Sequence, residues 1–457
     1  MASTRDRTVA VWKRTIWLSW PIAIQQTLNT LMRTVDIVVA GMISPFAVAA
    51  VGLADLYAQF PLRIGLSLGT GAIALSSQET GRGVTTIRDR AITQALVMGF
   101  LLGLPFILIG LGVSGFLIEI LGAEADVVEL GGAYLLIVFA AAPMRITGLV
   151  GARSLQGTGD TITPMLVNGG ANMLNIYLTI TLGLGLLGMP DLGIIGIGVA
   201  TAISRTFEAV FMVLAIVSRW TEPGLARPRS LIITKQLIDI SLPNFAEGLS
   251  SSLASFPFNA IILLFGTEAN AAYHIGRRVY QQLGGPLYRS YSVATSILVG
   301  QSLGEGDTDE ARFITLAITA FGVLTLGVTS GILLIWTESI AWLFTDDLET
   351  LEIAIDFVAV FALAIVLFGI FSPVAGCLRG AGDTRTPFYA RLSGAIVFQL
   401  GLSYLLAVVF GLGLLGIYLG LILNYAWWVL VVSFGFFRGT WQVKASEMIA
   451  ERAAMDD

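Results

Sequence analysis

Long apolar stretches alternate with short polar segments along the whole chain. A helix that crosses a lipid bilayer needs about 20 consecutive, predominantly apolar residues. Twelve stretches meet this requirement, at roughly 15–41, 47–76, 91–118, 128–151, 164–188, 193–217, 237–264, 271–301, 313–342, 352–377, 387–409 and 413–437. They do not show the period of two that a membrane β-strand requires. The pattern therefore predicts an all-α integral membrane protein with twelve transmembrane helices.

The amino-acid composition excludes several classes of protein function. Hydrophobic residues make up 55% of the chain and charged residues 12%, and the mean hydropathy is +0.82. Soluble domains carry about 25% charged residues, so a soluble enzyme, a nucleic-acid-binding protein and a disordered scaffold are excluded. The single histidine, His274, and the single cysteine, Cys377, cannot form a disulfide within the chain or a Cys/His metal cluster. We expect no cofactor.

The basic residues fall in alternate connections between the predicted helices. They occur in both terminal segments and in 77–90, 152–163, 218–236, 302–312 and 378–386. The connections in between contain no Lys or Arg. Because basic loops stay on the cytoplasmic side, this distribution predicts an even number of spans. It also predicts a multi-pass protein of the plasma membrane with both termini in the cytoplasm.

The chain contains an internal repeat. Residues 153–164 and 376–387 share the pattern L-x-G-x-G-D-T-x-T-P at a displacement of 223 positions. Ser19 and Pro21 match Ser241 and Pro243 at a displacement of 222. In each half the long motif lies in a predicted cytoplasmic loop, where its Asp and Thr can cap the helix that begins near its Pro.

The repeat divides the predicted helices into two groups of six. We expect an N-lobe over 1–222 and a C-lobe over 223–457. Six spans return the chain to its starting side, so the two six-helix repeats are parallel and related by an axis along the membrane normal. This symmetry is typical of transporters that rock two lobes about a central site.

These features resemble the multidrug and toxic compound extrusion (MATE) transporters. The resemblance rests on the paired G-x-G-D-T-x-T-P motifs and on G-Q-x-x-G at 300–304. It also rests on Pro21, which precedes Asp36 by fifteen residues in the first span, as in the DinF-like branch. The resemblance implies a secondary antiporter, not an enzyme. Such a protein exports small cationic amphipathic compounds in exchange for inward H⁺ or Na⁺, and the two-lobe design works as a monomer.

Asp36 is the first candidate for ion coupling. A charged side chain within a span is costly and therefore a functional hypothesis by default. Arg33 lies three residues away, within reach of a structural ion pair, so that alternative stays open. We hypothesise that protonation of Asp36 bends the first helix, because Pro21 removes one of its backbone hydrogen bonds.

The resemblance implies partners for Asp36 on the fifth and sixth helices. The DinF-like branch carries L-N-x-x-x-D on its fifth helix. Here Asn175 matches and Thr179 replaces the Asp, while Thr201 resembles a further polar position on the sixth helix. These residues could bind Na⁺ or form hydrogen bonds around a protonated Asp36. The missing second carboxylate favours H⁺, since hard cations prefer several anionic oxygens.

Two other acids within the spans are candidates for a second coupling or substrate site. Asp55, in the second span, could capture a cation or pair with Arg63. Glu247 lies four residues after Pro243 in the seventh span. Another MATE branch has a carboxylate in its seventh helix, but at a position nearer to Ser252.

Other functions compete with the antiporter interpretation. A flippase for lipid-linked oligosaccharides belongs to the wider superfamily and would use the many membrane arginines. A passive channel is a further alternative. The chain has no G-x-x-x-x-G-K-[ST] motif, which excludes an ATP-driven pump within it. A membrane prenyl transferase would need an acid-rich motif inside a span, and the Asp-Asp pairs at 346–347 and 456–457 lie outside the spans.

Overall fold

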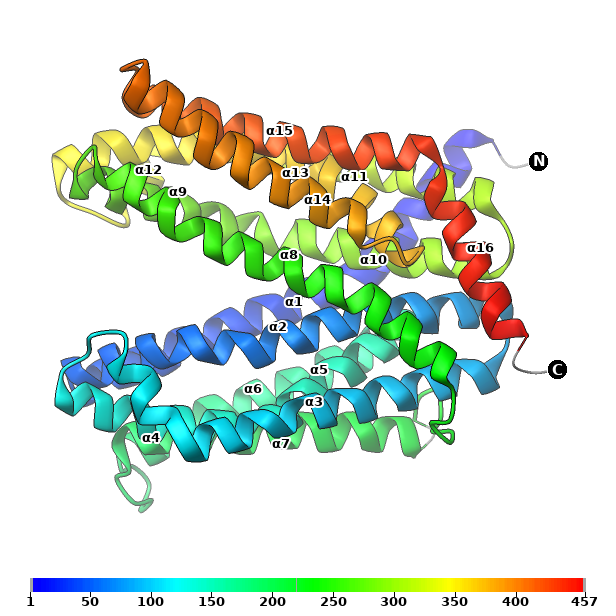
Figure 1. The fold of residues 1–457 in the computed structure, drawn as a ribbon, viewed down its shortest axis with the longest axis horizontal. Helices are drawn as coiled ribbons and strands as arrows, with labels where there is room; N and C mark the ends of the chain where they lie inside the picture. The colour runs from blue at the N-terminus through cyan, green and yellow to red at the C-terminus, as the bar shows by residue number, and fades with distance from the viewer. Residues whose placement is uncertain (1–2, 219, 455–457) are drawn as a thin grey trace. The chain divides into compact units, whose positions relative to one another are not determined.

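The structure is a computed structural model that describes residues 3–218 and 220–454. The described residues form helices joined by short connections and contain no β-strand (Figure 1). The helices are α1 (Thr4–Ile43), α2 (Pro45–Arg82), α3 (Thr85–Glu119), α4 (Ala125–Ala140), α5 (Ala142–Gly157), α6 (Ile162–Gly183), α7 (Gly193–Val217), α8 (Leu231–Leu263), α9 (Thr267–Leu283), α10 (Gly285–Gly304), α11 (Thr308–Ile335), α12 (Thr337–Trp342), α13 (Leu348–Gly380), α14 (Arg385–Gly394), the π-helices η1 (Ala395–Leu402) and η2 (Leu405–Val409), α15 (Leu414–Arg438) and α16 (Thr440–Ala453).

Seven of the described helices are long and apolar enough to cross a membrane, and the bent pair α4–α5 raises the number to eight. Four predicted spans are not among them: those in α1, α6 and α8, and the span at 271–301 that α9 and α10 form. Helices α1, α6 and α8 contain the candidate residues Asp36, Asn175, Thr179 and Glu247. The polar side chains that suggest function also lower the apolar character of the helices that carry them.

Three of the predicted spans are each divided into two α-helices, and one of these, at 313–342, is divided into α11 and α12 at Trp336. The span predicted at 128–151 bends by 48° between α4 and α5. Pro143 lies in the first turn of α5, where it lacks the backbone donor that a continuous helix would need. The span predicted at 271–301 is interrupted at Gly284, and Pro286 lies in the first turn of α10.

The span predicted at 387–409 changes from α-helix to π-helix. It begins as α14 and continues as η1 and η2, and Ser403 Oγ donates to the carbonyl of Phe398, five residues earlier. Helix α15 packs against this segment through glycines, because an added Cβ at Gly420 would lie only 3.0 Å from Ser403 Cβ and from the Phe398 carbonyl oxygen. Small residues allow such close approach between membrane helices.

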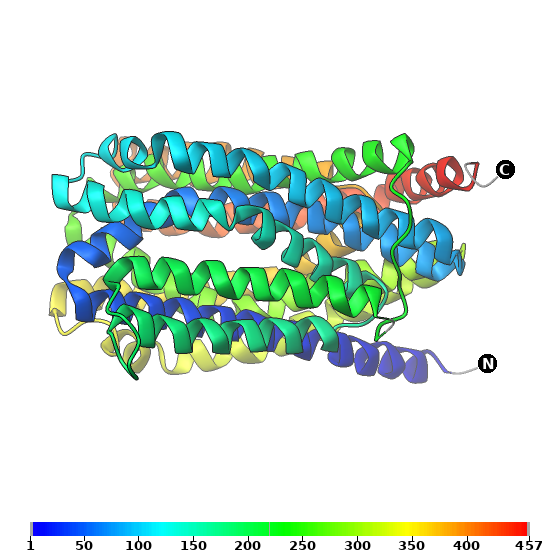
Figure 2. The same ribbon diagram turned by 90° about the horizontal axis from the view of Figure 1, so that it is seen from below.

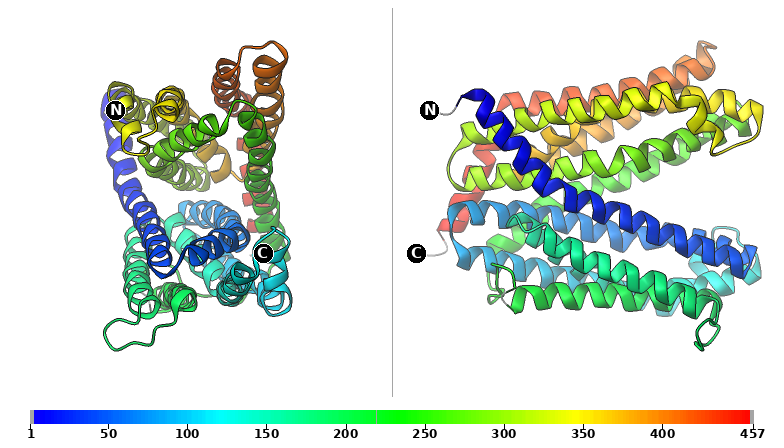
Figure 3. Two further views of the ribbon diagram at one scale, coloured as in Figure 1. Left: turned by 90° about the vertical axis from the view of Figure 1, so that its left-hand side faces the viewer. Right: turned by 180° about the vertical axis from the view of Figure 1, so that it is seen from behind.

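By its contacts the described chain forms two compact units. The N-terminal unit contains residues 24–241, and the C-terminal unit contains residues 3–23 and 242–454. Helices α1 and α8 each contribute to both units, and α1 is visible as one long helix in Figure 3. Pro21 and Pro243 lie within two positions of the two boundaries. The lobe boundary between 222 and 223 stays a prediction.

The segment between α7 and α8 is held against α3 (Figure 2). The backbone N–H of Ala226 donates to Thr93 Oγ1 at 2.9 Å, and Gln94 Nε2 donates to the carbonyl of Ser230 at 2.6 Å. Arg88, which is buried, forms an ion pair with Glu222 at 2.6 Å. These contacts therefore attach the non-helical connection to α3 within the N-terminal unit.

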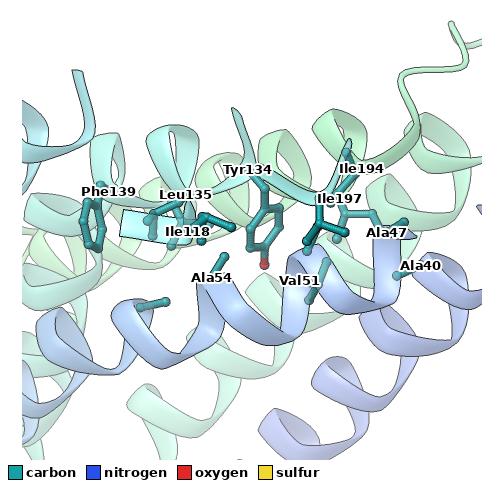
Figure 4. Close-up of a cluster of buried hydrophobic side chains, with 14 of the residues drawn as sticks. Ala40, Ala47, Val51, Ala54, Ile118, Tyr134, Leu135, Phe139, Ile194 and Ile197 are labelled. Atoms are coloured by element: carbon teal, nitrogen blue, oxygen red, sulfur yellow. The ribbon is translucent and has the colours of Figure 1, made fainter. Parts of the chain in front are cut away.

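One hydrophobic core of the N-terminal unit joins α1, α2, α3, α4 and α7 (Figure 4). Tyr134, Leu135 and Phe139 of α4 contribute the large side chains. Alanines of α1 and α2 supply the small surfaces against which they pack: Ala40, Ala47, Ala50, Ala54 and Ala58. This core holds the C-terminal half of α1, which carries Asp36, next to α2 and α7.

A glycine contact in the C-terminal unit leads to a stability prediction. A Cβ added to Gly322 of α11 would lie 2.7 Å from the carbonyl oxygen of Gly369 on α13, whereas one added to Gly327 would have no neighbour within 4 Å. We expect Gly322→Leu to lower the free energy of unfolding by about 1–3 kcal/mol through overpacking. Gly327→Leu, on the same helix, should change it little. Thermal unfolding in detergent measures both, and equal effects would contradict the packing argument.

Candidate functional site

Asp36 and Thr179 are in direct contact. Thr179 Oγ1 donates a hydrogen bond to Asp36 Oδ1 at 2.9 Å, which joins α1 to α6. Asp36 is 7% exposed and Thr179 is fully buried. A buried carboxylate needs such a donor because burial of an unpaired charge is costly. The structure thus brings together these two residues, which the sequence separates by 143 positions.

Asn175 and Thr201 extend the contact towards α7. Thr179 Oγ1 lies 3.5 Å from Asn175 Oδ1, and Asn175 Nδ2 donates to Thr201 Oγ1 at 3.4 Å. The same amide donates to the hydroxyl of Ser204 at 3.2 Å, and Ser204 is not among the residues predicted from the sequence. All four predicted coupling residues therefore lie in one continuous group of polar contacts.

The structure gives Asp36 no ion pair with Arg33 in the part of the chain that it describes. The charged groups that act on Asp36 electrostatically are Arg205, Asp55 and Arg33. The short contact of Asp36 is with the neutral hydroxyl of Thr179. Because this partner is neutral, Asp36 can gain or lose a proton without breaking an ion pair.

A second buried polar network lies on the same face of α6. Asn168 Nδ2 donates to Glu208 Oε1 at 2.8 Å, and Arg205 pairs with Glu208 Oε2 at 2.8 Å. Asn172 Nδ2 donates to Asn168 Oδ1 at 2.9 Å and to Asn29 Oδ1 of α1 at 3.0 Å. Arg205 and Glu208 are three residues apart on α7, the spacing at which side chains of neighbouring helical turns meet.

The sequence itself contains a signal for this polar face of α6. Asn168, Asn172, Asn175 and Thr179 follow one another at intervals of four, three and four residues. This is the period of one helix face, and all four side chains are buried. A polar stripe along an otherwise apolar span could have identified Asn168 and Asn172.

Asp55 lies in the same unit as Asp36 and is partly buried in α2. The sequence suggests Arg63 as its partner, but the charged groups that act on Asp55 most strongly are Arg33 and Arg145. Arg145 donates to the carbonyl of Ala58 at 3.4 Å. Asp55 is thus influenced by basic residues of two other helices, Arg33 of α1 and Arg145 of α5.

Glu247 belongs to the C-terminal unit, not to the unit of Asp36. Arg379 Nη2 of α13 donates to its two carboxylate oxygens at 2.8 and 3.1 Å. Arg391 Nε of α14 lies 2.9 Å from Glu247 Oε1. Glu247 is 3% exposed, so this carboxylate joins three helices inside the unit.

The repeated loop motif has a structural role in both halves. Asp160 Oδ1 accepts the backbone N–H of Thr163 at 2.9 Å, at the start of α6. Asp383 Oδ1 accepts the N–H groups of Arg385 and Thr386, each at 3.2 Å, at the start of α14. These bonds satisfy helix-terminal donors and confirm the predicted capping.

The described residues contain no group of three or more His, Cys, Asp or Glu side chains that could hold a metal ion. The polar oxygens around Asp36 come from one carboxylate and from neutral hydroxyl and amide groups. Pro21 lies inside α1, which continues through it as one helix. The site therefore consists of a carboxyl group and hydrogen-bonding partners.

A family profile matches the chain twice. The MatE family matches residues 21–181 and again residues 243–405. The two matches begin 222 positions apart, at Pro21 and Pro243. This displacement is the one found within the sequence, so the internal repeat is confirmed.

Curated relatives match nearly the full length of the chain. A probable multidrug resistance protein NorM of Photorhabdus laumondii is 28% identical over 439 residues, covering 90% of this chain and 92% of the relative. The protein of the same name from Thermotoga maritima is 27% identical, covering 96% and 95%. The probable multidrug resistance protein YoeA of Bacillus subtilis is 25% identical, covering 95% of each.

Solved structures show the same fold. A MATE crystal structure in complex with MaD3S superposes with a TM-score of 0.87 at 22% identity, covering 94% of this chain and 97% of the other. An outward-facing multidrug resistance MATE transporter superposes with a TM-score of 0.85 at 22% identity, covering 95% and 96%. With its two family matches and this fold, the chain belongs to the MatE family and is a membrane transporter, not an enzyme, with twelve transmembrane helices in two parallel six-helix repeats.

Proposed function

We propose that this protein is a secondary active multidrug efflux antiporter. It exports cationic amphipathic compounds in exchange for H⁺, works as a monomer in the plasma membrane and keeps both termini in the cytoplasm. The names of the relatives as multidrug resistance proteins support the efflux of several compounds. The two matching repeats support transport by rocking of two lobes.

The proposal rests mainly on the contact between Asp36 and Thr179. Asp36 is the acid in the group of contacts that includes Thr179, Asn175 and Thr201, and the other members are neutral. Such a set offers little negative charge to Na⁺, which prefers several anionic oxygens. A single buried carboxyl group bound to neutral partners suits proton binding, so H⁺ is the coupling ion and Na⁺ the alternative.

Protonation would rearrange these hydrogen bonds. A charged Asp36 accepts from Thr179 Oγ1, whereas a protonated Asp36 can donate to that oxygen. Thr179 is then free to direct its hydroxyl hydrogen to Asn175 Oδ1, at 3.5 Å. The proton thereby changes the connection of α1 to α6. Pro21, which weakens the hydrogen-bond ladder of α1, gives this helix a place to bend.

Asp55 supplies a second negative charge in the N-terminal unit. Its field acts on Asp36. In the proposed cycle a cationic compound is attracted by these two acids, and protonation of Asp36 reduces the attraction. The position of Asp36 in the first helix supports membership in the DinF-like branch of the family.

Dye uptake into everted vesicles tests the proposal, because the cytoplasmic side of the membrane faces outward in them. A cationic dye such as ethidium is added outside, and its accumulation is measured under a H⁺ gradient alone and then under a Na⁺ gradient alone, each with the higher ion concentration inside. Transport driven by the H⁺ gradient alone is expected. Transport driven by Na⁺ alone would show that Asn175, Thr179 and Thr201 complete a cation site despite the missing acid. No transport under either gradient would overturn the proposal in favour of the flippase.

A further inference from the structure

A group of charged residues inside the C-terminal unit has an excess of positive charge. Glu247 contributes one carboxylate, while Arg379 and Arg391 contribute two guanidinium groups. The side chains of the two arginines are 16% and 25% exposed, and that of Glu247 is 4% exposed. We call these three residues the arginine cluster. Its formal charge of one positive unit is poorly solvated, which is costly unless an anion approaches it.

The two arginines of the cluster differ in how many of their guanidinium nitrogens have a partner. Arg379 donates through Nη2 to Glu247 and through Nη1 to Ser292 Oγ at 3.3 Å. Arg391 faces Glu247 only with Nε. Its two terminal nitrogens make no hydrogen bond to any residue that the structure describes. Since two parallel N–H groups of a guanidinium fit a carboxylate in the bidentate manner, Arg391 presents an open edge for an oxyanion.

Aromatic rings surround this open guanidinium. The Cζ atom of Arg391 lies 4.7 Å from the ring centroid of Trp428 and 5.1 Å from that of Phe371. The Trp428 and Phe371 rings are 5.5 Å apart, and Tyr425 packs edge-on against Trp428 at 5.0 Å. A ligand that carries an aromatic ring next to an anionic group would find both partners here.

Three buried donors in and beside the cluster make no hydrogen bond in the described part of the chain. They are Arg379 Nε, Trp428 Nε1 and Arg391 Nε, whose contact with the carboxylate of the cluster is an ion pair only. Trp428 is 9% exposed. Buried donors are nearly always paired, and an unpaired one costs about 1–3 kcal/mol. The one unpaired acceptor that the structure describes beside them, Asn424 Oδ1, lies near Trp428 Nε1 at Gly394. The unpaired donors outnumber it and lie beside an excess positive charge, which indicates a missing acceptor.

We propose that the arginine cluster binds aromatic carboxylates, with the ligand carboxylate on the terminal nitrogens of Arg391 and the ring against Trp428 and Phe371. The inference rests on the proposed transport function and adds anionic aromatic compounds to its substrates. Glu247 is the internal competitor, because it occupies the same guanidinium groups when no ligand is bound. Loss of its charge strengthens ligand binding.

Equilibrium binding to the full-length protein tests this assignment. The protein is placed in nanodiscs of phosphatidylcholine alone, and binding of 2-naphthoate is compared with binding of the uncharged 2-naphthamide by calorimetry. We expect naphthoate to bind about 10-fold to 100-fold more tightly, the range of a hydrogen bond to a charged group. No gradient is used, so the result does not depend on whether dye efflux is driven by H⁺.

Substitutions separate ligand recognition from folding. Arg391→Gln should remove the preference for naphthoate and leave naphthamide binding unchanged, and Arg391→Lys should lose most of it because an ammonium group lacks the bidentate fork. Arg438→Gln, at an exposed arginine of α15, is the matched control and should keep the preference. Glu247→Gln should tighten naphthoate binding severalfold.

Three results would overturn the proposal. The first is equal affinity of the wild-type protein for the two naphthalene compounds. The second is an unchanged preference in Arg391→Gln. The third is displacement of naphthoate by phosphatidylglycerol added to the nanodiscs, which would assign the arginine cluster to a lipid headgroup instead of a transported compound.

Discussion

Asp36→Asn should abolish proton-driven dye efflux, lowering the response to a H⁺ gradient by about 100-fold. The asparagine side chain has nearly the same shape as a protonated carboxyl group and can still contact Thr179, 2.9 Å from Asp36 in the wild-type protein. It cannot release a proton, so the hydrogen bonds between α1 and α6 stay in one arrangement. The measurement is proton-driven ethidium uptake into everted vesicles at matched amounts of protein.

Two threonines of α6 provide a matched comparison for this prediction. Thr179→Val removes the donor to Asp36 and should reduce coupled efflux about tenfold, as expected for one hydrogen bond to a charged group. Thr181 is also buried, but its hydroxyl donates to the carbonyl of Tyr177 within the same helix. Thr181→Val should therefore leave efflux nearly unchanged. Full gradient-driven efflux by Asp36→Asn would make Asp36 structural and direct attention to Asp55 or Glu247.

Glu208→Ala should destabilise the folded protein by about 3–5 kcal/mol, the cost of breaking a buried ion pair. The substitution leaves Arg205, which is 8% exposed, without its 2.8 Å partner. It also removes the acceptor of Asn168. The free energy of unfolding is measured by denaturation with dodecyl sulfate in dodecyl maltoside micelles. A loss of this size would show that the pair supports the α6–α7 contact.

The exposed pair between Arg7 and Glu310 is the control for Glu208. The side chains of this pair are 49% and 31% exposed, so water screens their attraction. Glu310→Ala should change the free energy of unfolding by less than about 1 kcal/mol. Similar losses for Glu208→Ala and Glu310→Ala would refute the argument that burial makes the first pair important.

The amino-acid sequence by itself determined the class of the protein, the repeat and the family. These features depend on local patterns, such as apolar runs, basic loops and the motif shared by 153–164 and 376–387. Local chemistry also determined the Arg205–Glu208 pair and the caps at Asp160 and Asp383, because the interacting groups are only two or three residues apart.

Only the tertiary structure decided which distant groups meet. Asp36 and Thr179 are 143 positions apart, and Glu247 and Arg379 are 132 positions apart. No local pattern specifies such contacts, since they depend on how whole helices pack. The break between α4 and α5 at Pro143 likewise follows from packing, because Pro21 interrupts the hydrogen bonds of α1 without dividing that helix. A proline permits a bend, and the surrounding helices decide whether the bend occurs.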